Sequence, residues 1–366
     1  MNGQSRRGIV AASAGLALAA CWSQAAEARG PASPPGESPA WIPVTYRLQE
    51  QSGTPGLGIS LAALNPPVTR MEAGLGDESL ALAARAPSAD AATYGPPDQQ
   101  AQPGLGRDSS RYRSFGSQVG AVKWEIAAVA AYYTAVNGSK LFEHPVAPHF
   151  HTEGYFGRST ANVGIDKLAH AYSSYVISEI FYARLKRKTG DAPGIQYTAA
   201  ALGFGAMLYT ELYDSIERTA GWSWEDVSFN AAGAGFSILR NSIPGLDRKL
   251  DYRLMIVPSS AGYKLSGKRH FEAQRYFFAL KLSGFDTLEH SPLRFLELHL
   301  GYRGKNFTNE DRAAGIRPER RIFVGVGINL RELLFKDSDS RIGRAAGSVL
   351  EYFQPPYTAL HADLTK

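Results

Sequence analysis

Acidic, imidazole and amide side chains recur at helical spacing in three separate parts of the sequence. Residues three or four positions apart lie on one face of a helix, so each such pair presents two polar groups together. The pairs are Asp166 with His170, Glu211 with Asp214, and Asp226 with Asn230. Carboxylates and imidazoles are the groups that divalent-metal binding and general acid/base catalysis require.

If the pairs meet in the fold, they predict one site with two overlapping sets of candidates. The catalytic candidates are Asp166, His170, Glu211, Asp214 and Asp226. The metal-ligand candidates are His170, Glu211 and Asp214, with His149 and His151 as weaker ones. A mixture of imidazole and carboxylates suits zinc or a related transition metal better than calcium, which prefers oxygen ligands alone. The expected cofactor is therefore a zinc-like divalent metal.

Each of these residues also has a structural explanation. Asp226 completes a capping-box pattern that begins at Ser223, and Asp166 is a first-turn acid that the helix dipole favours. Lys167 would be solvated or would pair with an acid at position 211 or 214. The two loop histidines would be exposed polar residues, as is common in loops. The sequence leaves these alternatives open.

Apolar periodicity predicts four helices that would position the polar groups. Their ranges are 116–137, 166–188, 195–217 and 223–243. Short loops join them, so consecutive helices should run antiparallel and the three polar pairs should share one end of the bundle. The loop 139–165 leads to the same end and carries His144, His149, His151 and Glu153.

Residues 192–210 carry no charge, and such a length nearly reaches a membrane span. A buried core helix and a membrane-embedded helix are both compatible with this composition. The small residues at 231–235 would permit close contact between helices in either environment.

Beyond residue 251 the apolar period changes to two, which is typical of strands. Strands are expected over 276–282, 296–302 and 322–330, with a fourth at 252–257. The predicted fold class is therefore α+β. It comprises a four-helix apolar bundle followed by a small antiparallel sheet of three or four strands, whose apolar face lies on the helices.

The N-terminus has the pattern of an export signal that ends in a lipid anchor. Arg6 and Arg7 precede an uncharged run from Gly8 to Ala20, which is too short to span a bilayer. Leu18-Ala-Ala-Cys21 matches the bacterial lipobox, and Cys21 is the only cysteine. We expect residues 1–20 to be a signal peptide and Cys21 to carry fatty acyl groups such as palmitate. Trp22 in place of Asp favours the outer membrane, facing the periplasm. The alternative is cleavage after residues 26–28, which would leave a soluble periplasmic protein.

The composition of the chain predicts the remaining domain boundaries. Twelve of the 21 prolines lie within 31–103, so residues 21–115 are predicted to be a disordered tether rich in Pro, Gly and Ala. A helical domain at 116–245, a β region at 246–335 and a C-terminal tail at 336–366 would follow.

The net charge and cysteine content exclude two classes of protein. The net charge of +5 in 366 residues is too small for a nucleic-acid binder, and one cysteine excludes a disulfide framework.

Four segments together resemble the domain-of-unknown-function family 2279, whose members are described as predicted periplasmic lipoproteins. They are Asp166-Lys-Leu-Ala-His170, Glu211-Leu-Tyr-Asp214, Gly221-Trp-Ser-Trp-Glu-Asp226 and Asn230-Ala-Ala-Gly233. The resemblance covers about residues 145–240 and implies an envelope location. VanZ-like membrane proteins show a more distant likeness, with Asp214 at a position where they usually have Gln. Neither family implies a reaction.

The sequence thus predicts a lipoprotein anchored in the outer membrane, with membrane lipid as its partner through the acylated N-terminus. Its function would be that of an envelope accessory or scaffold protein. The alternative is a membrane-proximal, metal-dependent hydrolase or transferase that acts on an envelope lipid or glycan. The enzyme hypothesis requires the polar residues to line a concave pocket. The scaffold hypothesis requires each acid to cap a helix or pair with a nearby cation.

Overall fold

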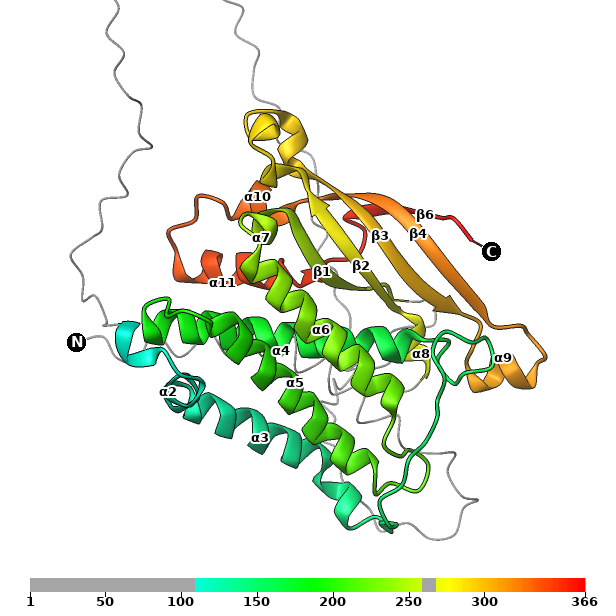
Figure 1. The fold of residues 1–366 in the computed structure, drawn as a ribbon. Helices are drawn as coiled ribbons and strands as arrows, with labels where there is room; N and C mark the ends of the chain where they lie inside the picture. The colour runs from blue at the N-terminus through cyan, green and yellow to red at the C-terminus, as the bar shows by residue number, and fades with distance from the viewer. Residues whose placement is uncertain (1–108, 259–267, 366) are drawn as a thin grey trace, which may run out of the picture. The chain divides into compact units, whose positions relative to one another are not determined.

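The computed structural model describes residues 109–258 and 268–365. The predicted signal peptide, Cys21 and the predicted tether up to residue 108 lie outside these ranges. The described chain forms a layer of helices and a sheet, with the long helices below the sheet in Figure 1. The predicted α+β class is therefore confirmed.

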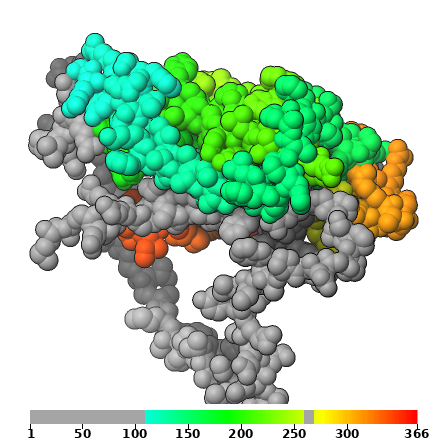
Figure 2. Space-filling view, turned by 90° about the horizontal axis from the view of Figure 1, so that it is seen from below, coloured from blue at the N-terminus to red at the C-terminus, as the bar shows by residue number. Residues whose placement is uncertain are grey.

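The helical layer begins with two short helices where one long helix was predicted, because the chain breaks at Val122. The elements are η1 (Ser109–Tyr112), α2 (Phe115–Ala121), α3 (Lys123–Asn137), η2 (Gly138–Leu141), α4 (Ile165–Thr189), α5 (Ile195–Asp214) and α6 (Trp224–Ser242). Figure 2 shows α2 and α3, in cyan to blue-green, on one outer surface of this layer. The Tyr133 side chain of α3 packs against Met207 of α5.

Glycines set the close approach of the three long helices. A Cβ on Gly233 of α6 would lie 1.9 Å from the Ala171 carbonyl oxygen of α4, and one on Gly203 of α5 would lie 2.1 Å from Ser178 Oγ. Only glycine permits backbones to come this near. Among the described residues, no helix combines the length and the hydropathy that crossing a membrane requires.

The described sheet has six strands in the order β5-β1-β2-β3-β4-β6. The strands are β1 (Leu250–Ile256), β2 (Gln274–Lys281), β3 (Leu296–Lys305), β4 (Glu319–Ile328), β5 (Phe353–Gln354) and β6 (Ala359–Asp363). Neighbouring strands are antiparallel except for β5, which pairs parallel to β1. The prediction of three or four antiparallel strands was therefore wrong. The two extra strands, β5 and β6, are short, and no run of alternating apolar and polar residues predicts them.

Short helices connect the strands and extend the chain beyond them. They are α7 (Leu246–Lys249), α8 (Lys268–Glu272), η3 (Leu282–Gly284), η4 (Asp286–Leu288), η5 (Pro292–Phe295), α9 (Asn309–Ala313), α10 (Leu330–Leu334) and α11 (Arg341–Val349). Because α11, β5 and β6 are ordered elements, residues 336–366 contain part of the fold as well as connecting segments.

The main core lies between α4 and the first two long strands. The Tyr172 ring of α4 contacts those of Tyr252 of β1 and Tyr276 of β2 in T-shaped or tilted geometry. Tyr175 of α4 also contacts Tyr252, and Phe236 of α6 contacts Phe278 of β2. The predicted packing of the apolar sheet face on the helices is therefore present at β1 and β2. It does not extend across β3, β4 and β6, where this face is exposed.

Candidate functional site

Three helix ends meet at one side of the helical layer. The first turns of α4 carry Asp166 and His170, the last turn of α5 carries Glu211, and the start of α6 carries Asp226 and Asn230. Ser223 caps α6 by accepting a hydrogen bond from the Asp226 backbone N–H at 3.2 Å. The acids of α4 and α6 thus stand at the positive ends of two helix dipoles, which favour negative charge.

His170 lies between two buried carboxylates. Its Nδ1 is 3.4 Å from Glu211 Oε1, and its Nε2 is 3.5 Å from Asp226 Oδ1. Asn230 lies beside these residues. Its Oδ1 is 3.3 Å from His170 Nδ1, and its Nδ2 donates to Glu211 Oε1 at 3.4 Å. One donor atom from each of His170, Glu211 and Asp226 lies within 4.8 Å of the other two. We call these three residues the His170 cluster.

Lys167 joins a second group of carboxylates to the same site. Its side chain is 1% exposed, and its Nζ lies 2.8 Å from Asp226 Oδ1 and 3.0 Å from Asp166 Oδ2. It also donates to Glu153 from the preceding loop. The expectation that Lys167 is solvated or pairs with residue 211 or 214 was therefore wrong. A cation at a helix N-terminus opposes the dipole, and the three carboxylates offset that cost.

Two glutamates of the site, the buried Glu211 and the half-buried Glu153, have raised pKa values. Burial raises the pKa of Glu211 well above its usual range, and the charges of neighbouring carboxylates, Asp226 first, raise it further. Burial likewise raises the pKa of Glu153 to about 7, with Asp226 adding to the shift and Lys167 opposing it. Both residues would therefore exchange protons or hold a cation more readily than ordinary surface acids.

Asp226 and Lys167, in contrast, both favour their charged forms. Burial opposes ionisation of Asp226, but the charges of His170 and Lys167 outweigh it and hold the Asp226 pKa below its usual range. Burial also lowers the pKa of Lys167, yet the three carboxylates around it outweigh this effect and leave the pKa raised. Asp226 and Lys167 therefore form a stable charged pair at neutral pH.

The cluster opens into a cavity of about 310 Å³. The polar residues that line it include His151, Glu153, Asp166, His170, Asp214 and Asp226. Four of the five predicted catalytic residues thus reach one concave surface. Glu211, the fifth, belongs to the His170 cluster behind it. The site therefore meets the requirement of a pocket, while Lys167 also pairs with three of its acids.

Asp214 differs from the other predicted ligands. It lines the cavity, but its carboxylate pairs with Lys140, whose Nζ also lies 2.8 Å from Glu217 Oε2. Lys140 is buried, so both acids compensate a charge that is largely shielded from water. Asp214 is not a member of the His170 cluster, and the predicted ligand set gains Asp226 in its place.

The loop before α4 is held against the segment between α5 and α6 by backbone hydrogen bonds. His149 N–H donates to Ser215 at 3.0 Å, and His151 N–H donates to Trp222 at 3.0 Å. Gly221, with φ of 134°, allows this contact because a Cβ there would lie 2.5 Å from that of His151. His151 is exposed at the cavity wall. Neither His149 nor His151 belongs to a described group of metal-binding type.

The sequence places Glu153 in the loop that leads to this end, but it does not predict the pairing of Glu153 with Lys167, and it does not single out Lys140. Glu153 lies in the loop 14 positions before Lys167, and Lys140 lies 74 positions before Asp214. Neither distance follows a local period, so pairing of this kind is visible only after folding. The burial of both lysines is the feature that a sequence alone does not reveal.

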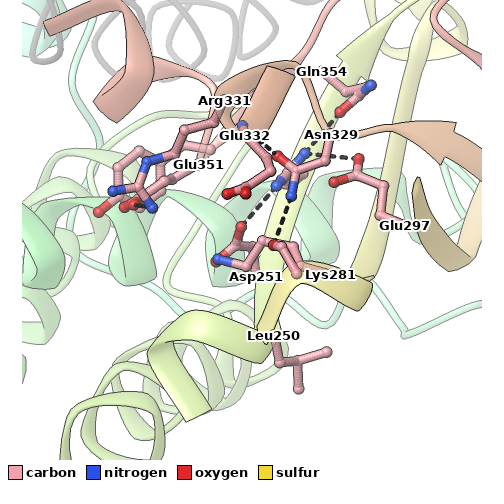
Figure 3. A network of polar contacts seen from close by, with 12 residues as sticks. Leu250, Asp251, Lys281, Glu297, Asn329, Arg331, Glu332, Glu351 and Gln354 are labelled. Atoms are coloured by element: carbon pink, nitrogen blue, oxygen red, sulfur yellow. Dashed lines mark hydrogen bonds and ion pairs between the residues drawn. The ribbon is translucent and has the colours of Figure 1, made fainter. Parts of the chain in front are cut away.

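A second buried charge network surrounds Asp251 of β1 (Figure 3). Asp251 of β1 is fully buried and accepts from Arg240 at 3.1 Å, Arg253 at 2.8 Å and Lys281 at 2.8 Å. Arg253 also pairs with Glu297 at 2.8 Å. Most of these charges pair with one another, while Arg253 Nε and Glu297 Oε2 are buried without a hydrogen-bond partner among the described residues. Because Arg240 also pairs with Glu179 of α4 at 2.7 Å, the network ties α4 and α6 to β1, β2 and β3.

Residues 152–242 match a family model described as "Predicted periplasmic lipoprotein (DUF2279)". The resemblance to this family is therefore confirmed over that segment, which contains the whole His170 cluster together with Glu153, Lys167 and Asp214. Neither the search of curated proteins nor that of solved structures finds a match. The likeness to VanZ-like membrane proteins stays a prediction.

Proposed function

We propose that the protein is a lipoprotein anchored in the outer membrane through acylated Cys21, and that the His170 cluster binds a divalent metal used in hydrolysis or group transfer. The substrate would be a lipid or glycan of the envelope. The family description and the lipobox support the location. The cavity beside the cluster supports a small-molecule or chain-end substrate.

One observation carries the metal hypothesis: donor atoms of His170, Glu211 and Asp226 lie within 4.8 Å of one another, and all three residues are buried. One imidazole and two carboxylates are a donor set that zinc accepts. Burial, with the charges of neighbouring carboxylates adding to it, raises the pKa of Glu211 and keeps it protonated, and a divalent cation would replace that proton. Binding should therefore release a proton and strengthen with pH.

The chain's own groups would perform the proton transfers. Zinc in such a site acts as a Lewis acid and lowers the pKa of bound water. Glu153 has its pKa raised to about 7 and lines the cavity, so it suits a general acid or base near neutral pH. Lys167 would hold Glu153 and Asp226 in place beside the cavity.

The pairing of Lys167 favours a second candidate function. Because Lys167 already binds Glu153, Asp166 and Asp226, most acids of the site have a partner without a metal. The polar end would then be an internal brace for a non-catalytic envelope scaffold. The two candidates differ in whether Glu211 and His170 bind a cation.

The anchor is tested by fractionating cells that carry the parent chain or Cys21→Ser. We expect the parent in the outer-membrane fraction and the variant in the soluble periplasm. Recovery of the variant in the membrane at the parent's level would show that the attachment lies elsewhere.

Catalysis is tested with purified envelope phospholipids and, separately, peptidoglycan fragments, with products followed by mass spectrometry. We expect products that disappear with a chelator and return with added zinc. Glu153→Gln should lose turnover while it retains metal, whereas Glu289→Gln, an exposed change elsewhere, should match the parent. Metal binding without turnover of either substrate class would contradict catalysis on these substrates, and absence of bound metal would support the scaffold.

A further inference from the structure

The sheet has an apolar surface that the helices cover at β1 and in part at β2 and that is exposed on β3, β4 and β6. Directly paired residues of β2, β3, β4 and β6 share this face, as in the row Phe278, Leu300, Val324, Ala362 and the row Leu280, Leu298, Val326, Leu360. Leu298 and Leu300 are 45% and 54% exposed, and Leu360 is 84% exposed. We call these two rows, with Ile322 and Ile328, the apolar sheet face. Contiguous exposed patches of this kind mark surfaces that bind other molecules.

Strand β3 has the reverse of the usual arrangement, in which apolar side chains are buried and polar side chains face water. On β3 the side chains of the opposite face, such as Glu297 and His299, are buried, while the leucines between them are exposed. The even-numbered positions of β2, β3, β4 and β6 carry no acidic residue. A surface that only had to face water would place its charged residues here instead.

Two arginines, Arg158 and Arg320, lie at the edge of the apolar sheet face near Ile322. A cavity of about 440 Å³ lies between Phe156, Arg158, Tyr302, Arg320, Ile322 and Thr365. Among the described residues, neither Arg158 nor Arg320 forms an ion pair with a carboxylate, and Arg158 Nε is buried without a hydrogen-bond partner. Arg320 donates to the Phe156 carbonyl, which holds its guanidinium at the cavity.

We infer that the apolar sheet face docks on a membrane surface that contains anionic phospholipid, with Arg158 and Arg320 at the phosphate groups. Aliphatic side chains beside guanidinium groups match the layering of acyl chains and phosphates at a bilayer surface. This contact is separate from the acyl anchor at Cys21. It rests on the proposed envelope location and is independent of the metal site.

Charge complementarity selects lipid over a second copy of the chain. Two copies joined through this face would bury aliphatic side chains, but the face offers no carboxylate to the arginines of the partner. A phospholipid surface supplies phosphates and acyl chains together. The positive net charge of the chain favours an anionic surface as well.

The test uses the full chain with Cys21→Ser, so that no acyl anchor contributes, and co-sedimentation with vesicles. Vesicles of phosphatidylcholine alone are compared with vesicles that contain phosphatidylglycerol. We expect clear binding only to the anionic vesicles. The double variant Arg158→Gln/Arg320→Gln should weaken it about tenfold or more. Arg218→Gln/Arg248→Gln removes the same charge from other exposed positions and should change binding far less.

The contribution of the aliphatic side chains to vesicle binding is tested with the double variant Leu298→Gln/Leu300→Gln. It should reduce binding to the anionic vesicles while circular dichroism and the thermal midpoint show a folded chain. Excess inorganic phosphate should not displace the parent from vesicles, because a free anion lacks the acyl chains.

Three results would overturn the inference. They are absence of binding to anionic vesicles, equal losses in the two arginine double variants, and a concentration-dependent dimer that Leu298→Gln/Leu300→Gln abolishes. Loss of the membrane anchor in cells would contradict the proposed lipidation but would leave the vesicle result unaffected, so the two failures are distinguishable.

Discussion

His170 Nε2 lies 3.5 Å from Asp226 Oδ1, the same oxygen that accepts a hydrogen bond from Lys167 at 2.8 Å. Asp226 therefore belongs to both halves of the polar site. On one side it compensates a buried lysine, and on the other it faces the imidazole and Glu211. A metal at the His170 cluster would share this carboxylate with Lys167, so the stability of the fold and cation binding should be coupled.

Replacing Lys167 with Met tests the structural half of the site. The change leaves Glu153, Asp166 and Asp226 near one another without their cation, so the free energy of unfolding should fall by about 3–5 kcal/mol at pH 7. Urea unfolding measures this loss. The control Lys186→Met removes an exposed pair with Asp191 and should cost about 0–1 kcal/mol. A Lys167→Met protein as stable as the parent would show that the acids do not depend on this lysine.

Stability should depend on pH through the two raised carboxyl pKa values. The folded protein keeps a proton on Glu153 between pH 4.5, its usual pKa, and about 7, whereas the unfolded chain releases it. The free energy of unfolding should therefore fall as pH rises through this window, and Glu211 should extend the fall upward. Glu153→Gln should give a shallower slope, and Glu289→Gln should retain the slope of the parent. Identical slopes for all three proteins would refute the assignment.

Close packing of α4 and α6 positions the site and can be tested at two glycines. Gly233→Ala would place a Cβ 1.9 Å from the Ala171 carbonyl oxygen, so we expect a loss of about 1–3 kcal/mol in thermal or urea unfolding. At Gly235, two residues later, an added Cβ would have nothing within 4 Å. Gly235→Ala should instead stabilise the helix by roughly 0.5–1 kcal/mol. Equal effects of the two changes would contradict the packing described for these helices.

The buried network of the sheet predicts a large effect far from the cavity. Asp251→Asn would leave Arg240, Arg253 and Lys281 short of one buried negative charge, at a cost of about 3–5 kcal/mol. Asp286→Asn, at an exposed acid 4.0 Å from Arg248, should change stability by less than about 0.5 kcal/mol. Chemical denaturation of both variants compares the two positions directly. An Asp251→Asn loss as small as that of Asp286→Asn would show that the network contributes little.

The helical half of the fold was accessible from sequence because its signals are local. Apolar residues at spacings of three and four predicted α4, α5 and α6, and Ser223 marked the start of α6. Short connections then implied that His170, Glu211 and Asp226 share one end. The break at Val122 was missed because the apolar period continues through it.

The remainder depends on contacts between distant segments. The strand β5 has two residues and pairs with β1 almost 100 positions earlier, which no period can show. The partners of Lys167 and Asp214 likewise come from other parts of the chain. The exposure of Leu298 was missed because alternation shows that one face is apolar and leaves open what covers it.

Metal content tests the central claim most directly. The Cys21→Ser chain is dialysed against zinc, then against metal-free buffer, and analysed for bound metal. We predict one equivalent of zinc in this chain and in its Asp214→Asn variant, whose altered residue pairs with Lys140, and none in the His170→Ala or Glu211→Gln variants. Absence of zinc from every protein, or equal zinc in the parent and in folded His170→Ala, would contradict a metal centre at the His170 cluster.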